Sequence, residues 1–169
     1  MANVSVRHAE PDDAQAVHRI LCGPRATAGT MQLPLQSVED VRKRFFSETR
    51  EGLYHLVACV DEEVVGHLGL ETFSRPRRRH VGEIGMAVRD DWQSRGVGTA
   101  LMEAALDLAD NWLGLTRIEL SVYTDNAAGT SFRVSEISPS SWSSRSPQNT
   151  PLTSGVPSLP TTTRSLSIL

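Results

Sequence analysis

A short glycine-containing turn, placed between an apolar run and a helical pattern, is the feature that most constrains this chain. The turn reads Gln93-Ser94-Arg95-Gly96-Val97-Gly98; it follows the apolar run 84–88 and precedes the helical pattern 99–112. The first N–H groups of a helix lack backbone partners and lie at the positive end of the helix dipole, so a helix start here suits a phosphate group. Gly96 and Gly98 have no Cβ, which lets a ligand approach the backbone closely. Because the G-x-G spacing also occurs in ordinary strand-to-helix turns, the flanking residues carry the argument.

The chain up to residue 129 alternates between predicted strands and helices. Alternating or continuous apolar patterns predict strands at 4–9, 55–61, 64–73, 81–88 and 117–123. Helical periodicity predicts helices at 11–21, 37–46 and 99–112, the second opening on a capping box formed by Ser37 and Asp40. The acidic turn 61–63 predicts a hairpin, and the segment 23–36, with two glycines and two prolines, is predicted to be a loop.

The composition changes abruptly after Gly129. Of the forty residues 130–169, 12 are Ser, 6 are Thr and 5 are Pro, without sustained periodicity. This composition predicts a disordered or loosely packed tail. We therefore divide the chain into a core, 1–129, and an atypical tail, 130–169. One hypothesis is that the tail is translated out of frame or otherwise replaced from about residue 130.

Charge and cysteine usage exclude several classes of protein. The net charge is −3; the tail contributes +2, which leaves −5 for the first 129 residues and argues against nucleic acid as a partner. The basic run 75–80 is interpreted as a solvated loop, with nucleic-acid binding as the alternative. Cys22 and Cys59 have no metal-ligand or disulfide-framework spacing. With no signal pattern at the amino terminus and no membrane-length apolar run, the sequence predicts a cytoplasmic protein without a membrane partner.

With the turn placed between strand and helix, the chain resembles the GNAT superfamily of acetyl-CoA-dependent N-acetyltransferases over residues 3–129. The signature [QR]-x-x-G-x-[GA] matches Gln93 to Gly98, and the order of predicted elements matches as well. Segments 56–59, 64–68, 75–78 and 110–113 make it most similar to bacterial amino-acid N-acetyltransferases. The resemblance implies an α/β fold with a mixed, mostly antiparallel sheet flanked by helices. It also implies transfer of an acetyl group from acetyl-CoA to a small-molecule primary amine, plausibly that of an amino acid, without a metal.

The resemblance assigns a set of cofactor-binding residues. Backbone amides from Gln93 to Thr99 would hold the pyrophosphate, and Arg95 would add a charge-assisted hydrogen bond. The strand containing Met86, Ala87 and Val88 is expected to diverge from its neighbour and to pair with the pantetheine arm. Asn126, in the segment Asp125-Asn126-Ala127-Ala128, is expected to contact the cofactor or its bound water, or to cap a helix. The full set is Met86, Ala87, Val88, Gln93, Arg95, Gly96, Val97, Gly98, Thr99 and Asn126.

Attack by the amine requires removal of a proton from its ammonium form. Glu83, five residues before Val88 on an apolar strand, is the first candidate for the base; its alternative reading is an outward-facing, solvated glutamate. Glu119 is the second candidate, with an exposed ion-pair partner as the alternative, and His80 is a third. Substrate contacts are assigned to Thr30 and Gln32 in the predicted loop and to Tyr123, which shares a strand face with Glu119.

The chain departs from the family pattern after Asn126. Phe132 stands where a tyrosine that protonates the departing thiolate is expected, and the later strands have no evident counterpart. An alternative function is therefore a catalytically impaired CoA-binding module. A homodimer is possible because relatives often dimerise through the region that is abnormal here.

Overall fold

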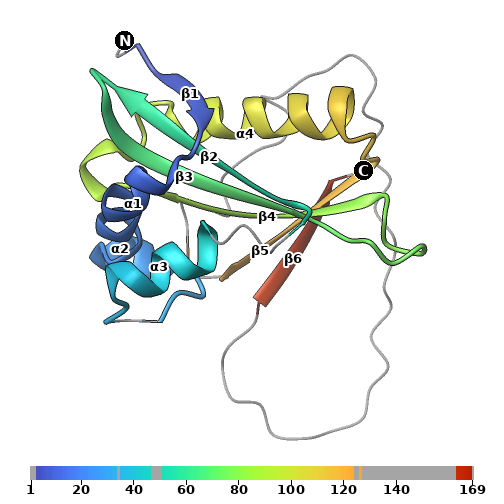
Figure 1. Ribbon diagram of the computed structural model, residues 1–169, viewed down its shortest axis with the longest axis horizontal. Helices are drawn as coiled ribbons and strands as arrows, with labels where there is room; N and C mark the ends of the chain where they lie inside the picture. The colour runs from blue at the N-terminus through green and yellow to red at the C-terminus, as the bar shows by residue number, and fades with distance from the viewer. Residues whose placement is uncertain (1–2, 34, 47–50, 124–125, 127–162, 169) are drawn as a thin grey trace, which may run out of the picture.

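The computed structural model describes residues 3–33, 35–46, 51–123, 126 and the backbone of 163–168. Six strands form one sheet in the order β1-β2-β3-β4-β5-β6 (Figure 1). Every neighbouring pair is antiparallel except β4 and β5, which are parallel. The predicted mixed, mostly antiparallel sheet is therefore confirmed. The strands are β1 Ser5–His8, β2 Leu53–Val60, β3 Glu63–Thr72, β4 Val81–Val88, β5 Arg117–Tyr123 and β6 Thr163–Ile168.

Helices cover both faces of the sheet (Figure 1). The long helix α4 packs on one face through Leu101 and Met102, and α1 packs on the other through Val17 and Ile20. Because both faces are covered, the central strands read as continuous apolar runs, and residues 55–60 are all buried. The helical segments are η1 Pro11–Asp13, α1 Ala14–Leu21, α2 Pro24–Gly29, α3 Val38–Phe45, η2 Asp90–Trp92, α4 Val97–Asp107 and η3 Leu108–Trp112.

The one parallel pair decides where the glycine turn lies. Parallel neighbours need a crossover connection, and α4 supplies it between β4 and β5. The residues between Val88 and Val97 therefore lie at the carboxyl end of β4, at the start of the crossover helix. Ligands of such strand–helix units bind at this edge of the sheet.

The predicted hairpin and capping box are confirmed. Asp61 and Glu62 both adopt left-handed backbone angles, with φ of 48° and 65°, as expected of the tight turns that suit the twist of a hairpin. The Ser37 side chain accepts from the Asp40 amide at 3.0 Å, and the Asp40 carboxylate accepts from the Ser37 amide at 3.0 Å. Both features are local, and each involves residues at most three apart.

Two predicted irregular segments contain regular structure. The predicted loop 23–36 is wrong over Pro24–Gly29, which forms α2. The helix has only six residues, too few to show a period, although Pro24 stands at a preferred first-turn position. In the predicted tail, Thr163–Ile168 forms β6 and pairs with β5, which gives that edge of β5 backbone partners. The hypotheses on residues 127–162 lie outside the described residues.

Asp13 anchors the start of the first helix to β1. Arg7 donates to its two carboxylate oxygens at 2.7 and 2.8 Å, and the Glu10 amide donates at 2.8 Å. The side-chain hydrogen bonds from Arg7 are the main reason that the pKa of Asp13 is lowered. We expect Asp13→Asn to lower the free energy of unfolding at pH 7 by about 1–2 kcal/mol, because Arg7 is half exposed and the ion pair is partly screened.

The pH dependence of this effect has a defined sign. A carboxylate whose pKa is lowered in the folded state adds stability above its unfolded pKa, and that stability is lost as the pH falls through the folded value. The difference between wild type and Asp13→Asn in urea unfolding should therefore shrink below about pH 4. The exposed neighbour Asp12 supplies the control, and Asp12→Asn with an equal loss at pH 7 would contradict the assignment.

Candidate active site

A cavity opens where β4 and β5 diverge. Their backbone pairing runs from Val81–Arg117 to Ile84–Leu120 and then stops, although both strands continue. A cavity of about 870 Å³ lies at this divergence and is lined by the parts of both strands that no longer pair with each other. Met86, Ala87 and Val88 are among its lining residues. The expected divergence of this strand from its neighbour is thus present, and it leaves strand backbone facing the cavity.

The glycine turn forms one wall of this cavity at the start of α4. Gly96 has φ of 84°, in the left-handed region, and precedes the helix without any side-chain cap. The first amides of α4 therefore have no partner within the helix, and they lie at the positive end of its dipole. Gly96, Gly98 and Thr99 line the cavity, as does Gln93. This wall has the donors and the charge that a pyrophosphate needs.

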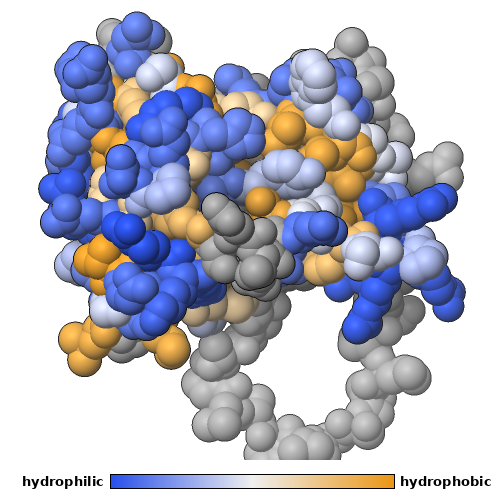
Figure 2. Space-filling view, viewed as in Figure 1, coloured by the Kyte–Doolittle hydropathy of each residue, from blue (hydrophilic) through white to orange (hydrophobic). Residues whose placement is uncertain are grey.

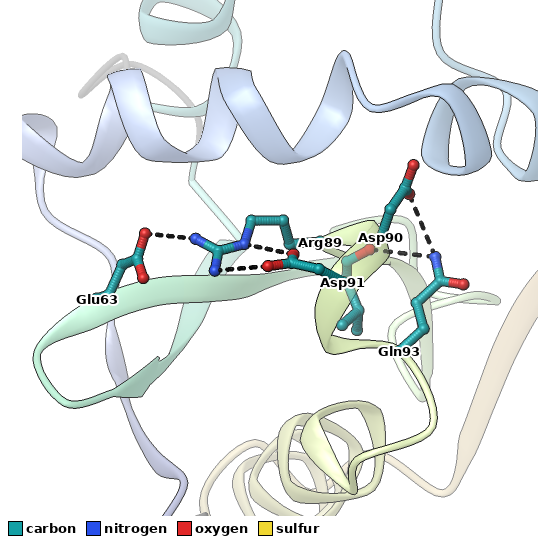
Figure 3. A network of polar contacts seen from close by, with 6 residues as sticks. Glu63, Arg89, Asp90, Asp91 and Gln93 are labelled. Carbon is teal, nitrogen blue, oxygen red and sulfur yellow. Dashed lines mark hydrogen bonds and ion pairs between the residues drawn. The ribbon is translucent and has the colours of Figure 1, made fainter.

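A polar network holds the turn in place (Figure 3). Arg89 donates to Asp91 at 2.7 and 3.0 Å and to Glu63 at the start of β3. These hydrogen bonds raise the pKa of Arg89, and the hydrogen bonds from Arg89 lower the pKa of Asp91. The side-chain amide nitrogen of Gln93 (Nε2) lies 3.4 Å from the Val88 carbonyl oxygen. The position of the turn therefore depends on the neighbouring hairpin as well as on its own sequence.

Hydrogen bonds hold both ends of the short helix α2 against other residues that line or border the cavity. At its amino end, the Arg25 amide donates to Asp90 at 3.2 Å, and the Arg25 guanidinium donates to Gln93 at 3.4 Å. At its carboxyl end, the Asn126 side chain donates to the Gly29 carbonyl at 3.0 Å. Segment 25–32, which contains all of α2 after Pro24, supplies Thr30 and Gln32 to the cavity. The expected substrate residues thus lie in the segment directly after α2, a helix that is held in place by contacts between residues distant in sequence.

The floor of the cavity lies on the face of the sheet that α3 also covers. His67 and His55 are both buried, and His55 Nδ1 lies 3.1 Å from His67 Nε2, with the Phe45 ring 5.1 Å from each imidazole. Burial, followed by the proximity of His55 and Arg44, lowers the pKa of His67 to about 3. His67 is therefore neutral at physiological pH. Both histidines line the cavity.

The structure separates the two candidate bases. Glu83 is exposed on β4 and lines the cavity. Glu119, directly opposite on β5, forms ion pairs with Arg78 at 3.1 Å and Arg117 at 3.0 Å and is not among the cavity residues. The position of Glu119 therefore agrees with the alternative interpretation, an ion-pair partner. We assign the base role to Glu83 in the proposal below. His80 lies exposed in the β3–β4 connection and does not line the cavity either.

Three other expected contacts lie outside the cavity lining. Tyr123 is half-buried at the end of β5 and is not among the residues that line the cavity, so its contact with the substrate stays a prediction. The Val97 side chain is buried in the core beneath α4, which leaves only its backbone for a ligand. The Arg95 guanidinium stacks over the Trp92 ring, 5.0 Å from its centroid, at the exposed side of the turn. Asn126, by contrast, lines the cavity.

Several cavity residues were missed by the sequence reading. They are Arg25, Arg44, His55, His67 and Glu71. His55 begins one predicted strand and His67 stands inside the next. Each is a polar residue flanked directly by apolar residues or glycine, and this is the signal that marks them. No comparable signal marks Arg25 or Arg44, which belong to ordinary polar helix positions.

These features define a GNAT-type acetyltransferase fold and site. The chain matches the model of the acetyltransferase (GNAT) family over residues 22–132, and it belongs to that family. Over 127 residues it is 42% identical to the L-amino acid N-acetyltransferase AaaT of Escherichia coli (strain K12), covering 75% of this chain and 77% of that protein.

Solved structures share the fold. A putative phosphinothricin N-acetyltransferase is similar with a TM-score of 0.64 at 25% identity, covering 73% of this chain and 76% of that chain. The structure of yncA, a putative acetyltransferase from Salmonella typhimurium with its cofactor acetyl-CoA, is similar with a TM-score of 0.64 at 20% identity, covering 75% and 74%. The predicted family and the predicted acetyl-CoA-dependent N-acetyltransferase activity are therefore confirmed.

The described part of the chain contains neither a metal-ligand cluster nor a helix of membrane-spanning character. No group of three His, Cys, Asp or Glu side chains there is arranged to hold a metal ion. No helix among the described residues has the length and apolar character needed to cross a membrane.

A substitution at Gly96 tests whether the glycine turn and the start of α4 bind the pyrophosphate of acetyl-CoA. We expect Gly96→Ala to raise the KM for acetyl-CoA about fivefold to tenfold, because a methyl group enters the space beside the first amides of α4. The left-handed backbone should also cost about 1 kcal/mol of stability. Steady-state kinetics and thermal unfolding measure the two effects.

Gly114 is the matched control for this substitution. It also has a positive φ, 61°, with open space around it, but it lies in the turn before β5 and does not line the cavity. Gly114→Ala should lose similar stability without a change in the KM for acetyl-CoA. Equal KM values in the two variants would refute the assignment of this wall.

Proposed function

We propose that this acetyltransferase acts on the primary amine of a free amino acid. The observation that carries the proposal is a cavity with the glycine turn and the first amides of α4 at one side, suited to a pyrophosphate. An exposed glutamate, Glu83, lines the same cavity. The 42% identity to an L-amino acid N-acetyltransferase supports an acceptor of the same class.

The cofactor would lie along the divergent strands. Backbone amides of 96–99 would hold the pyrophosphate, with Gln93 beside them, and the backbone of 86–88 would pair with the pantetheine arm. Arg95 would turn from Trp92 toward a phosphate oxygen, and Asn126 would approach the cofactor from the end of β5. Bound acetyl-CoA supplies an acetyl group activated as a thioester.

Glu83 would serve as the proton acceptor. The acceptor arrives as an ammonium, whose nitrogen has no free lone pair, and Glu83 takes one proton from it directly or through a water molecule. The neutral amine nitrogen then forms a bond to the carbonyl carbon, the carbon–sulfur bond breaks, and its electron pair leaves with sulfur. The nitrogen would then lose its remaining extra proton, and transfer of that proton to the departing sulfur would give the CoA thiol. Thr30 and Gln32 would contact the acceptor from the α2 side.

A panel assay tests this function. Thiol release from acetyl-CoA would be followed with each of the twenty amino acids, and with simple alkylamines as controls. We expect release with one or more amino acids at a kcat/KM at least tenfold above that with the alkylamines. Absence of release with every amine, together with CoA binding in calorimetry, would instead favour the catalytically impaired CoA-binding module suggested by Phe132.

The remaining biological assignments are also proposals. We propose that residues 1–129 form the catalytic core and 130–169 an appended tail, that the protein acts in the cytoplasm, and that nucleic acid is not its partner. The last point is supported by Arg78, which is engaged with Glu119 and stacks 3.9 Å from the Phe73 ring centroid. Unchanged mobility of DNA and RNA probes at low salt would agree with it.

A homodimer is proposed from the molecular surface. The segment between α2 and α3 exposes Met31, Leu33 and Leu35, the last almost fully. Figure 2 shows hydrophobic side chains projecting at the α2–α3 end of the molecule. Sedimentation of the wild type and of Leu35→Asp tests this proposal, since a dimer through this surface should dissociate in the variant.

A further inference from the structure

We infer that Arg44, on α3, binds the α-carboxylate of the amino-acid acceptor and thereby selects amines that carry a carboxylate. The inference rests on the proposed function, because it needs an amino acid in the cavity. It is carried by a group of hydrogen-bond donors that Arg44 and Gln32 form at the cavity wall.

Arg44 lies at the cavity wall in the last turn of α3. Arg42 and Lys43 share this turn, where basic residues suit the negative end of the helix dipole, but neither of them lines the cavity. The Arg44 guanidinium stacks over the Phe45 ring, 4.9 Å from its centroid, and the Phe45 ring lies 5.1 Å from the His67 ring on the cavity floor. Arg44 is therefore placed beside the floor, which stabilisation of the helix dipole does not require.

Gln32 fixes one N–H group of this guanidinium and adds a donor of its own. Arg44 Nη1 donates to Gln32 Oε1 at 2.9 Å, and Gln36 Nε2 donates to the same oxygen at 3.3 Å. Because both neighbours are donors, the Gln32 amide presents its oxygen to them, and its nitrogen remains as a donor. Both Gln32 and Arg44 line the cavity. This part of the wall therefore offers N–H donors, which a carboxylate accepts.

The charge of Arg44 is not neutralised within the described part of the chain, where no carboxylate lies within ion-pair distance of its guanidinium. Glu39 and Asp40, the acidic residues of α3, interact with other residues of the helix and its cap. The other arginine among the described cavity residues, Arg25, contacts Gln93 beside the glycine turn, where the pyrophosphate is expected. A ligand carboxylate at the α3 end of the cavity would therefore meet the guanidinium of Arg44.

Arg44 and Glu83 lie toward opposite ends of the cavity floor. Arg44 is close enough to His67 to contribute to the lowered pKa of that residue, and His67 lies opposite Ala87 in the β3–β4 register. Glu83 lies four residues before Ala87, which corresponds to about 13 Å along a strand. Gly85 lies between these ends, and a Cβ built on it would meet no atom within 4 Å. An amino acid above Gly85 can therefore direct its carboxylate toward Arg44 and its ammonium toward Glu83.

The other charges near Glu83 are already engaged within the protein. Glu71, opposite Glu83 on β3, has an interaction partner. Glu119, opposite Glu83 on β5, forms ion pairs with Arg78 and Arg117. The orientation of the acceptor therefore depends on the guanidinium at the α3 end and on the base already proposed, Glu83.

A pair of substrates isolates recognition of the carboxylate. The best amino acid of the panel is compared with its α-carboxamide, which has nearly the same shape and the same amine position but no negative charge. In Arg44→Gln, we expect kcat/KM for the amino acid to fall about tenfold to a hundredfold and kcat/KM for the amide to stay within about twofold of wild type. The two substrates differ in the pKa of the amine, but this difference cancels because each substrate is compared between two proteins.

Three measurements control for other effects of the substitution. Arg44→Lys keeps the charge without the planar fork of donors and should recover part of the loss. Arg42→Gln removes a cation from the same turn outside the cavity and should change neither substrate. The KM for acetyl-CoA should stay within about twofold of wild type in all three variants, and activity on the amide shows that Arg44→Gln is folded.

The outcomes separate this inference from the proposed function. Equal losses on the amino acid and its amide would show a general distortion of the cavity and would overturn the inference. A wild type that prefers the amino acid, together with an Arg44→Gln variant that keeps the preference, refutes the inference alone. A wild type without preference for any amino acid over its amide refutes the proposed function.

A binding measurement gives a readout that does not depend on turnover. The same amino acid is titrated calorimetrically into wild type and Arg44→Gln, each saturated with CoA. We expect its Kd to rise about tenfold or more in the variant, because a charge-assisted hydrogen bond is lost. Equal Kd values in the two proteins would refute the role of Arg44.

Discussion

Replacement of Glu83 by glutamine is expected to lower kcat for amino-acid acetylation by about 10²–10³-fold, because a positioned general base contributes about that much to proton removal. The variant keeps the shape of the side chain and loses only its ability to accept a proton. Steady-state kinetics at pH 7.5 measures the loss. The KM for acetyl-CoA should change little, since the glycine turn and the backbone of 86–88 are untouched.

The pH dependence distinguishes loss of a base from loss of shape. Free amine accumulates as the pH approaches the pKa of the acceptor ammonium, and a neutral amine needs no base for its first deprotonation. The ratio of wild-type to Glu83→Gln rates should therefore fall as the pH rises from 7 to 9. A ratio independent of pH would argue that Glu83 only shapes the site.

Glu119 provides the matched control on the neighbouring strand. It lies directly opposite Glu83 in the β4–β5 register but is engaged by Arg78 and Arg117. Glu119→Gln should leave kcat within about threefold of wild type, because exposed or half-exposed ion pairs contribute at most about 1 kcal/mol. A decrease of kcat in Glu119→Gln as large as that in Glu83→Gln would show that Glu119 takes part in proton removal.

The buried His67 is expected to make the protein less stable in mild acid. Its pKa in the folded protein is about 3, below the value of 6.5 for an unburied histidine. Below pH 6.5 the histidine of the unfolded chain therefore binds a proton, whereas the buried His67 of the folded protein stays neutral until the pH approaches 3. The contribution to stability is fully present above pH 6.5 and is lost as the pH falls toward 3.

The size of this effect is measurable by urea unfolding. Between pH 7 and pH 5, the wild type should lose about 1–2 kcal/mol more than His67→Gln, whose side chain does not titrate. The two proteins are compared by their change with pH, because the substitution also removes the contact with His55. His8→Gln, on the exposed side of β1, should keep the wild-type slope.

The identity of the elements followed from local patterns. The core helix pattern Ala14, Val17, Ile20 and Leu21 is buried as its spacing predicts, and β4, β5 and the β2–β3 hairpin lie within two residues of their predicted ranges. Period and turn chemistry act over a few residues, which a single sequence displays. Helix α2 was missed for the same reason, since a helix of six residues contains too little pattern.

The candidate site was only partly predictable. The glycine turn could be recognised in the sequence because it is a contiguous motif. Glu83 could be recognised because it interrupts an apolar strand. Glu119 interrupts its strand in the same way, and sequence could not show that arginines at 78 and 117 engage it. The difference between the two glutamates is a matter of neighbours, which a strand pattern does not contain.

The sequence by itself determined the family, the glycine turn at the start of α4 and the cofactor class, because backbone amides and missing Cβ atoms act through contiguous residues. The tertiary structure alone decided which side chains meet around the cavity. The pairing of Glu71 with Glu83, the contact of Asn126 with Gly29 and the neutral His67 all depend on strand register and burial. The first two of these contacts join residues 12 and 97 positions apart, and a one-residue shift in strand register would separate the two glutamates.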